Sequence, residues 1–373
     1  MIRSSRPVWL LALLLLVFPQ FGVAQGGAAQ GAGVSGASST AGTAGTAGTV
    51  IGDVVMLGTG TPLDHAMVSL VGGGRQTFTN DRGVFAFTQL APGTYHLRVV
   101  HLGFTPTLVD FVMPATGAAP RVRVELARVS VRLAAVKISG KPTCSNPGRP
   151  DPALNHDLFE VVQQVRFNAE QFQVVSDSFP FAYSVQRARR EVRADDARGP
   201  SVYDTLHMRS DAHGWEYKMG NVVERERNGH YVMHLPTLRD FAGIEFLNNH
   251  CFQYAGLDST KEGMLLRIDF RADDQIRTPD VNGTIYLDPK TYQIRLADLQ
   301  LSKLIAEVRE ITAVKVRTIF REIASNIIVF DRVIGTNEIK HGWGSWAVAA
   351  IEEDQRMMRF EWLQGEPGKG PVP

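Results

Sequence analysis

The stretch from Thr79 to Leu97 constrains the fold most, because turn-forming residues mark where two short strands begin and end. In the first turn, Asp81 can bond its own backbone and Gly83 permits a positive φ. Phe85 and Phe87 are two residues apart and therefore lie on one face of a strand. The sequence predicts a β fold here. The two turns are expected at Asn80–Gly83 and Leu90–Gly93, and the second strand at Thr94–Val100.

The length and charge of the chain limit the number of domains and the kinds of partner. Its 373 residues suffice for two domains that each bury a core. Lysine and arginine together number 39, against 38 for aspartate and glutamate. Because the charges balance, neither nucleic acid nor an anionic membrane surface is an expected partner. A hydrophobic content of 44% is that of an ordinary globular protein.

The first 24 residues have the order of a secretory signal peptide. Arg3 and Arg6 precede an apolar run from Val8 to Phe18, and the segment ends at the small residue Ala24. The apolar run is shorter than the ~20 residues of a membrane span, so an uncleaved anchor is the weaker alternative. We expect an exported chain, in the periplasm, associated with the outer membrane or outside the cell. The mature chain is not expected to span the membrane.

Residues 25–48 form a tract of Gly, Ala, Ser and Thr with almost no apolar surface to bury. Such a composition predicts a disordered linker. The pattern becomes β from residue 49 onward, with strands expected at Val50–Val55 and Ala66–Leu70.

A set of linked motifs in residues 49–138 resembles the carboxypeptidase regulatory-like domain. The motifs are Gly52-x-Val54, Gly60-Thr61-Pro62-Leu63, Ala66-x-Val68-x-Leu70, Thr79-Asn80-Asp81-x-Gly83-x-Phe85, Leu90-x-Pro92-Gly93-x-Tyr95 and Gly103-Phe104. The resemblance implies a prealbumin-like seven-stranded β-sandwich of the carbohydrate-binding-like superfamily. No sugar-contacting residue is carried over, because a shared fold does not fix function. The last strand of this sandwich is expected at 131–138.

The second half of the chain reads as a larger antiparallel β-sheet domain with one preceding helix. After a linker at 139–152, apolar spacing predicts a helix at 157–173 in a domain spanning 153–364. A short helix is expected at 238–246, and residues 365–373 are expected to be a disordered tail. The predicted strands are 181–185, 202–208, 251–256, 264–270, the two arms of a hairpin over 281–294, 308–323, 327–339 and 346–362, with turns at 258–261, 289–290 and 324–326. The predicted fold class is therefore mainly β.

One hairpin in this second domain suggests a further resemblance. Gly283 to Ile294 reads Gly-x-Ile-Tyr-x-Asp-Pro-x-Thr-Tyr-x-Ile. It resembles hairpins of periplasmic lipoprotein carriers, and that resemblance implies a curved sheet that holds acyl chains.

The sequence provides no set of catalytic, cofactor-binding or metal-binding residues. A metallocarboxypeptidase needs zinc ligands in an α/β domain, but His-Glu-x-x-His does not occur and no alternation of helices and strands is expected after Pro150. His230 and His234 are four residues apart, and the residues between them, Tyr231, Val232 and Met233, favour a strand. A strand separates the two imidazoles by roughly 13 Å, so half-buried or surface histidines are expected. His207 and His213 are the other close pair.

Three further groups of residues could form ligand sites but are each better explained by a structural role. Four arginines beside acidic residues favour a self-neutralising face over an anion site. Asp273 and Asp274 favour a loop, because calcium needs six or more oxygen ligands. The tryptophans favour core or edge packing over a sugar-stacking platform. The residues of the first and third groups are Arg187, Arg189, Arg190 and Arg193 with Glu191, Asp195 and Asp196, and Trp343, Trp346 and Trp362.

Cys144 and Cys251 are the only two cysteines and are expected to form one disulfide. An export signal places them in an oxidising compartment, where an even count without a metal motif favours a bridge. Two separately buried thiols are the alternative.

These observations favour a non-catalytic envelope protein that binds a ligand or has a structural role. Its partner is expected to be a carbohydrate, a lipid or another envelope protein. The alternatives are an accessory component of a TonB-dependent outer-membrane transport system, a lipid- or lipoprotein-binding periplasmic protein and, last, an undetected hydrolase. An apolar pocket under the helix would favour lipid, clustered exposed tryptophans would favour sugar, and converging carboxylates with shifted pKa values would favour an enzyme.

Overall fold

The structure is a computed structural model that forms two compact units. The N-terminal unit comprises residues 20–128 together with 366–373, and the C-terminal unit comprises residues 129–365 together with 1–19. The residues that the structure describes are 15–16, 48–118, 120–131, 143–212, 214–227, 229–341 and 344–369. Most of the predicted signal peptide and most of the linker at 25–48 lie outside this description.

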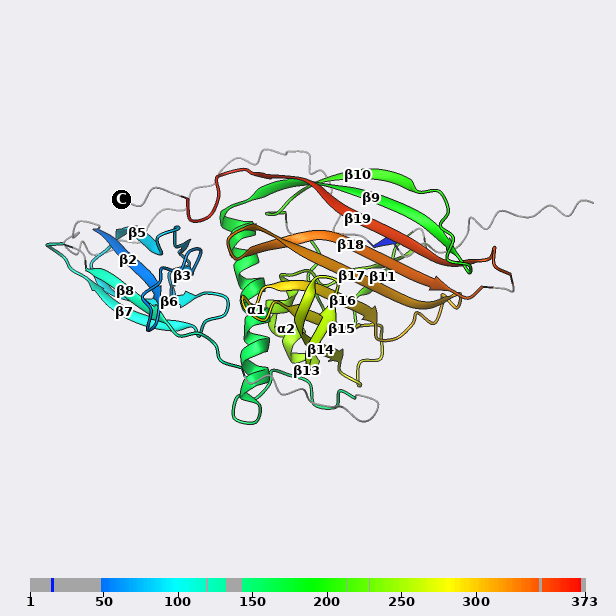
Figure 1. Cartoon of the computed structure of the whole chain (residues 1–373), viewed down its shortest axis with the longest axis horizontal. Coiled ribbons are helices and arrows are strands. Elements are labelled where there is room, and N and C mark those ends of the chain that lie inside the picture. The colour runs from blue at the N-terminus through cyan, green and yellow to red at the C-terminus, as the bar shows by residue number, and fades with distance from the viewer. Residues whose placement is uncertain are drawn as a thin grey trace, which may run out of the picture. The chain divides into compact units, whose positions relative to one another are not determined.

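The N-terminal unit contains seven strands in two sheets (Figure 1). A three-stranded sheet has the order β5-β2-β8, and a four-stranded sheet has the order β4-β3-β6-β7. The predicted seven-stranded β architecture is confirmed. The strands are β2 (Gly48–Met56), β3 (Met67–Leu70), β4 (Gln76–Phe78), β5 (Val84–Leu90), β6 (Gly93–Val100), β7 (Thr107–Met113) and β8 (Arg121–Leu126).

The turn before β5 has the predicted conformation but a different capping residue. Gly83 has a φ of +71°, and Phe85 and Phe87 are both buried, with 1% and 3% of their surface exposed. The side chain of Asn80, not that of Asp81, satisfies the turn. Its Oδ1 accepts hydrogen bonds from the backbone N–H groups of Arg82 and Val84, each at 3.0 Å. An asparagine at the first turn position bonds the backbone two residues on, as turns of this kind require.

The strands at the end of this unit differ from the sequence prediction. β7 and β8 were not predicted, although β8 alternates between buried and exposed residues along its whole length and β7 does so over part of its length. β8 pairs in parallel with β2, so no hairpin turn connects the two strands. The sequence next to β8 therefore contains no turn signal that would predict the pairing. The predicted last strand at 131–138 lies outside the described residues except for Val131, which is not in a strand.

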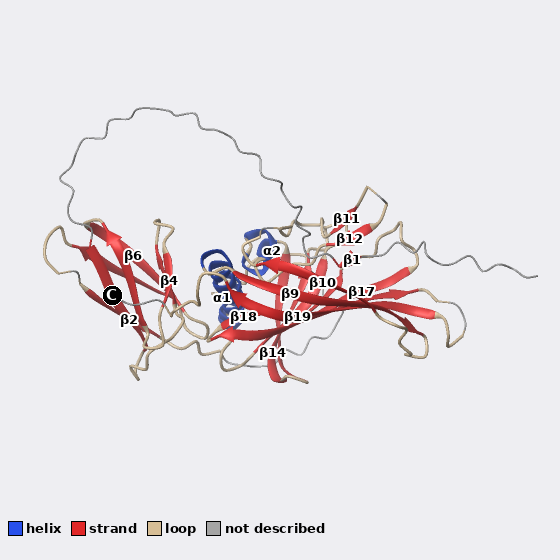
Figure 2. Cartoon of the chain, turned by 90° about the horizontal axis from the view of Figure 1, so that it is seen from above, coloured by secondary structure: helices blue, strands red, loops and turns tan. Residues whose placement is uncertain are grey.

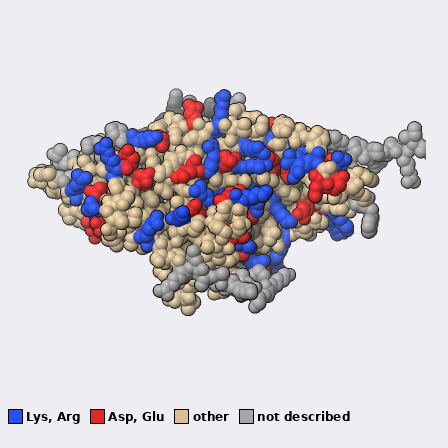
Figure 3. All heavy atoms as spheres, in the orientation of Figure 1, with Lys and Arg blue, Asp and Glu red and all other residues tan. Residues whose placement is uncertain are grey.

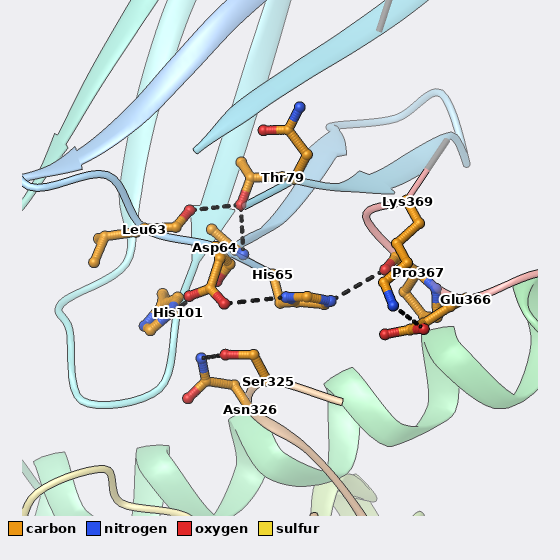
Figure 4. A network of polar contacts seen from close by, with 12 residues as sticks. Leu63, Asp64, His65, Thr79, His101, Ser325, Asn326, Glu366, Pro367 and Lys369 are labelled. Atoms are coloured by element: carbon orange, nitrogen blue, oxygen red, sulfur yellow. Dashed lines mark hydrogen bonds and ion pairs between the residues drawn. The ribbon is translucent and has the colours of Figure 1, made fainter. Parts of the chain in front are cut away.

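Polar contacts fasten loops of the N-terminal unit around a buried threonine (Figure 4). The Thr79 hydroxyl donates to the Leu63 carbonyl at 2.6 Å and accepts from the Ala66 N–H at 2.8 Å. Nearby, Nε2 of His65 lies 3.1 Å from the carbonyl oxygen of Pro367. Part of the segment predicted to be a disordered tail is therefore packed against this unit.

The C-terminal unit is built on a nine-stranded sheet in which every neighbouring pair is antiparallel. Its order is β10-β9-β19-β18-β17-β16-β15-β14-β13. The predicted large antiparallel sheet after one long helix is confirmed. The strands are β9 (Phe181–Arg193), β10 (Val202–Arg209), β13 (His250–Thr260), β14 (Gly263–Ala272), β15 (Val281–Leu287), β16 (Ile294–Leu301), β17 (Ile311–Ala324), β18 (Ile327–Ile339) and β19 (Val348–Trp362).

The helices and a small second sheet complete this unit (Figure 2). Its core joins apolar residues of the long helix, the two short helices and one face of the nine-stranded sheet. Helix and sheet bury these residues against each other because each is apolar on one side only. The elements are α1 (His156–Ser178), η1 (Asp240–Ala242), α2 (Ile244–Asn248) and a three-stranded sheet of β1 (Leu15–Leu16), β12 (Tyr231–Met233) and β11 (Val223–Arg225).

Element boundaries in the C-terminal unit depart from the prediction in three places. α1 runs five residues beyond the predicted end at 173 and begins after Asn155, whose Oδ1 accepts the Leu158 N–H at 3.0 Å. The predicted short helix at 238–246 is two short helices, η1 and α2. The β13–β14 turn lies at Lys261 and Glu262, later than predicted, because β13 continues through 258–260, where it pairs with 263–265 of β14.

A buried polar network lies beside α2. Both oxygens of Asp280 accept hydrogen bonds, from the Tyr217 hydroxyl at 2.9 Å and from the backbone N–H groups of Gly220 and Val281 at 2.7 Å. His250 Nε2 lies 3.8 Å from Asp280 Oδ1, and both side chains are fully buried. Burial lowers the pKa of His250, and the Asp280 carboxylate offsets part of that effect.

We expect both units to lose stability as the pH falls below about 6.5, the ordinary pKa of histidine. Burial lowers the pKa of His101 in the N-terminal unit as it does that of His250. A histidine with a lowered folded-state pKa takes up a proton on unfolding. Its contribution to the free energy of unfolding is therefore complete above its pKa in the unfolded chain. That contribution is lost as the pH falls towards its pKa in the folded protein, by at most about 1.4 kcal/mol per pH unit.

Urea unfolding at about pH 7.5 and pH 5.5 measures this dependence. For the C-terminal unit, His250→Gln should flatten the pH dependence whatever its effect on the stability itself. Equal or greater stability of the wild-type protein at the lower pH would contradict the prediction.

Candidate functional site

The side of the nine-stranded sheet that faces away from the helices carries polar side chains in register across the strands. One row crosses from β13 to β18, with each residue directly opposite the next. Its members are Gln253, Asp269, Thr284, Asp298, Arg317 and Ile334. Because side chains alternate between faces, residues two positions along form the next row on the same side.

The second row lies beside the first and holds amides, hydroxyls and cations. Asn282, Gln300, Lys315 and Thr336 are opposite one another in β15 to β18. Arg271 continues the row. Phe270 is opposite Gly283, and because the strands are antiparallel, the next residue of β14, Arg271, is opposite the preceding residue of β15, Asn282.

A pocket of about 940 Å³ extends over both rows. All six members of the first row and all five of the second line it. At the β13 end, its border includes Thr143, Asn155 and Leu158, together with Phe252 and Tyr254 of β13. Five internal strands and the edge strand β13 therefore supply one concave site within the C-terminal unit.

Polar groups of the first row largely satisfy one another. Arg317 forms two hydrogen bonds of 2.7 Å with the oxygens of Asp298. Asp269 accepts from the Thr284 hydroxyl at 2.7 Å and from Nε of Arg267 at 2.9 Å. The hydrogen bonds to the two carboxylates raise the pKa of Arg317 and of Arg267. This row is thus a rigid, charge-neutralised floor.

The second row has fewer internal contacts. Oδ1 of Asn282 accepts the backbone N–H of Ala272 at 3.0 Å, and the ammonium group of Lys315 pairs with Glu338. Gln300 is exposed and Arg271 is half-buried. This row therefore presents the side chains that a ligand would meet.

The surface over the C-terminal unit mixes both signs of charge. Figure 3 shows lysine and arginine side chains interspersed with aspartate and glutamate on the face in view. The predicted arginine run lies in β9 and is neutralised as expected, but by partners on neighbouring strands. Arg187 pairs with Asp204, Arg189 with Glu353 and Arg190 with Glu352, whereas the expected partners were Glu191, Asp195 and Asp196.

The histidine pair lies at the two ends of a strand, as predicted. His230 precedes β12 and His234 follows it. The His234 ring stacks on Trp215 with centroids 5.2 Å apart, and its Nε2 lies 3.2 Å from Glu224 Oε2. Of the other pair, His207 lies in β10 and His213 is outside the described residues.

The aspartate pair and Trp362 occupy structural positions, whereas Trp346 is exposed. Asp273 and Asp274 lie in the loop between β14 and β15, as predicted, and accept backbone N–H groups of Gln275 and Cys144. Trp362 packs against Phe181 and Phe360, while Trp346 is 74% exposed. The third tryptophan, Trp343, lies outside the described residues.

The predicted disulfide between Cys144 and Cys251 is present, with the two Cα atoms 5.5 Å apart. The segment after Cys144 is held by further contacts, since the Cys144 carbonyl accepts the Asp274 N–H at 2.9 Å and the Gly148 N–H bonds the His250 carbonyl. The disulfide thus fixes one border of the pocket, because Thr143 and Cys251 both line it.

Two features are absent from the residues that the structure describes. No three or more His, Cys, Asp or Glu side chains in that part of the chain gather where they could hold a metal ion. Among the helices described, none has the length and hydropathy of a membrane span. The expected lack of catalytic, cofactor and metal sites stays a prediction.

Several solved structures share a distant similarity with this chain. A LolA superfamily protein, NE2245 from Nitrosomonas europaea, is 12% identical over 56% of this chain and 96% of its own, with a TM-score of 0.28. A DUF1329 family protein from Desulfovibrio piger is 8% identical over 55% of this chain and 94% of its own, with a TM-score of 0.31. The minor pilin GBS52 from Streptococcus agalactiae is 15% identical over 26% of this chain, with a TM-score of 0.20. The chain spans 50% of that pilin.

The family comparison concerns the N-terminal unit. No curated protein matches the chain. Residues 49–127 match the family model of the carboxypeptidase regulatory-like domain, over β2 to β8. The motifs from Gly52 to Phe104 that suggested this family lie within the match. The N-terminal unit therefore carries a carboxypeptidase regulatory-like domain.

Proposed function

We propose that this chain is an exported, non-catalytic envelope protein that binds a polar, hydroxyl-bearing ligand in its C-terminal unit. The observation that carries the proposal is the pocket of about 940 Å³ on the polar side of the nine-stranded sheet. The volume lies in the range of ordinary ligand sites, which is roughly 300–1,000 Å³. Export is supported by the order of residues 1–24 and by the disulfide, which persists in oxidising compartments.

The chemistry of the pocket favours a saccharide over an acyl chain. Its two rows present amides, hydroxyls and charged groups, which a hydrocarbon chain would desolvate without replacing their hydrogen bonds, and apolar side chains such as Leu158, Phe252 and Ile334 complete the lining. The opposite side of the sheet, under α1, is filled by the core of the unit. Val161, Leu266, Ile268 and Ile285 there are fully buried. An acyl chain would have to displace such side chains.

The proposal of a non-catalytic role rests on how the pocket carboxylates are used. Asp269 and Asp298 are the two acidic residues of the described lining. Each is engaged by an arginine, and Asp269 also accepts the Thr284 hydroxyl. A general acid or base needs a carboxylate that can exchange a proton with the substrate, and strong ion pairs oppose this.

A substitution that fills the pocket tests the proposal. Gln300→Trp adds a large ring to an exposed pocket position on β16, and Gln275→Trp makes the same change at an exposed loop position outside the lining. In calorimetric titrations with short neutral and acidic oligosaccharides and with palmitate, a saccharide should bind the wild-type protein and the control. Gln300→Trp should weaken that binding at least about tenfold, or 1.4 kcal/mol.

Two outcomes would overturn the proposal. One is that no oligosaccharide binds the wild-type protein. The other is that palmitate binds and that Gln300→Trp leaves its affinity unchanged.

A further inference from the structure

The charges that line the pocket do not balance. Among the described lining residues, four are basic and two are acidic. The basic residues are Arg267, Arg271, Lys315 and Arg317, and the acidic ones are Asp269 and Asp298. The pocket lining therefore carries more positive than negative charge, although the whole chain is nearly neutral.

Three of the four cations are already paired. Arg267 bonds Asp269 and Arg317 bonds Asp298, both inside the pocket. Lys315 pairs with Glu338, which does not line the pocket. In the described part of the chain, no hydrogen bond or ion pair engages the guanidinium of Arg271. The excess charge thus resides at Arg271.

The surroundings of Arg271 suit an anion. The residue is half-buried on β14, opposite Cys251 of the disulfide and beside Asn282. A half-buried guanidinium is less well hydrated than an exposed one and offers a planar fork of donors. That fork matches a carboxylate or phosphate with two parallel hydrogen bonds.

The rest of the second row suits hydroxyl groups. From Arg271 outward it presents Asn282, Gln300 and, beyond Lys315, Thr336. Amides and hydroxyls both donate and accept, as sugar hydroxyls do. Neighbouring strands are about 4.8 Å apart, so such groups recur at short, regular intervals along the row.

The backbone of these strands is not available to a ligand. β14, β15, β16 and β17 are each paired on both sides within the sheet. A peptide that binds by adding a strand needs an unpaired sheet edge for its main-chain hydrogen bonds. Along the second row, which crosses β14 to β18, recognition therefore depends on side chains, and this favours a saccharide that lies across the row over a peptide added as a strand.

We propose that the pocket binds an acidic saccharide, whose carboxylate or phosphate is bound by Arg271 and whose hydroxyls are bound by Asn282, Gln300 and Thr336. This inference rests on the proposed function, because it names the ligand class of the same pocket. It adds that the negative charge of the ligand is recognised by one residue.

Matched probes and variants test the inference. Trigalacturonate is the carboxylate probe and its methyl ester the neutral counterpart, while glucose 6-phosphate and glucose form the phosphate pair. Arg271→Gln removes the cation, Arg271→Lys keeps the charge without the fork, and Arg277→Gln removes an exposed arginine outside the pocket lining. Titration calorimetry gives each affinity, and circular dichroism shows that each variant is folded.

We expect an acidic probe to bind the wild-type protein more tightly than its neutral counterpart. Arg271→Gln should weaken that binding at least about tenfold, the effect of losing a charge-assisted hydrogen bond. Arg271→Lys should lose less, and Arg277→Gln should change nothing. A response limited to trigalacturonate identifies a carboxylate as the bound group, and one limited to glucose 6-phosphate identifies a phosphate.

Other results separate this inference from the proposed function. One such result is that neutral and acidic sugars bind equally, and that Gln300→Trp weakens their binding whereas Arg271→Gln does not. It would overturn the inference and leave the proposed function in place. Tighter binding of triglutamate than of either acidic sugar would overturn the saccharide class. Failure of all saccharides to bind would overturn both.

Discussion

Replacing both Cys144 and Cys251 with alanine is expected to lower the free energy of unfolding of the C-terminal unit by about 3–4 kcal/mol. The two residues are 107 apart in sequence, so the bond closes a long loop. In the chain-entropy model, such a cross-link stabilises mainly by restricting the unfolded chain, and more so for longer loops. The loss is expected even though three nearby backbone and side-chain hydrogen bonds remain to hold the segment.

Tryptophan fluorescence during denaturation measures this loss selectively. Apart from Trp9 in the predicted signal peptide, every tryptophan lies between residues 215 and 362, inside the C-terminal unit. Reduction of the wild-type protein should reproduce the effect of the double substitution. Thiol titration of the unfolded, unreduced protein should detect no free thiol, and two reactive thiols per chain would contradict the bond itself.

The strands were predictable where a local signal marks them. Pro289 and Lys290 occupy the turn between β15 and β16, as their residue types require. Alternating apolar residues fix one buried face in β17 and β18, so these strands were predicted to within a few residues. β8 alternates as strictly, yet it was missed because its partner β2 is distant in sequence and parallel. Local patterns do not report non-local pairing.

The pocket was beyond sequence reasoning for the same physical reason. The run from Leu266 to Ala272 alternates apolar and charged residues, which marks a polar face on β14. Whether Asp298 meets Arg317 or another cation depends on the register of hairpins across the sheet. A shift of one residue in one hairpin would turn a whole strand's polar set to the other face. Only the assembled sheet brings the two rows together.

The expected disulfide shows the opposite case, in which composition was sufficient. Cys144 and Cys251 had a single possible intramolecular partner each, so pairing needed no knowledge of the fold. The same reasoning did not reveal that the bond borders the pocket, because Arg271 lies opposite Cys251 only through the β13–β14 register.

Gly83→Ala is expected to destabilise the N-terminal unit by about 2–5 kcal/mol, combining backbone strain with a steric clash. Gly83 has a φ of +71°, which costs an ordinary residue about 1–2 kcal/mol. An added Cβ would also lie 2.5 Å from the carbonyl oxygen of Val54 and 3.1 Å from the Leu63 nitrogen. Both are backbone atoms of the loop and strand that the turn packs against, so neither can rotate away.

Gly72→Ala is the matched control for this substitution. Gly72 has a φ of +77°, but nothing lies within 4 Å of an added Cβ, so only the backbone strain remains. We expect a loss of about 1–2 kcal/mol there. Differential scanning calorimetry measures both losses of stability. The transition of the N-terminal unit is the one that tryptophan fluorescence does not follow, because the tryptophans after residue 9 lie in the C-terminal unit. If the two substitutions cost the same, the close packing of Gly83 on Val54 contributes nothing to the stability of the sandwich.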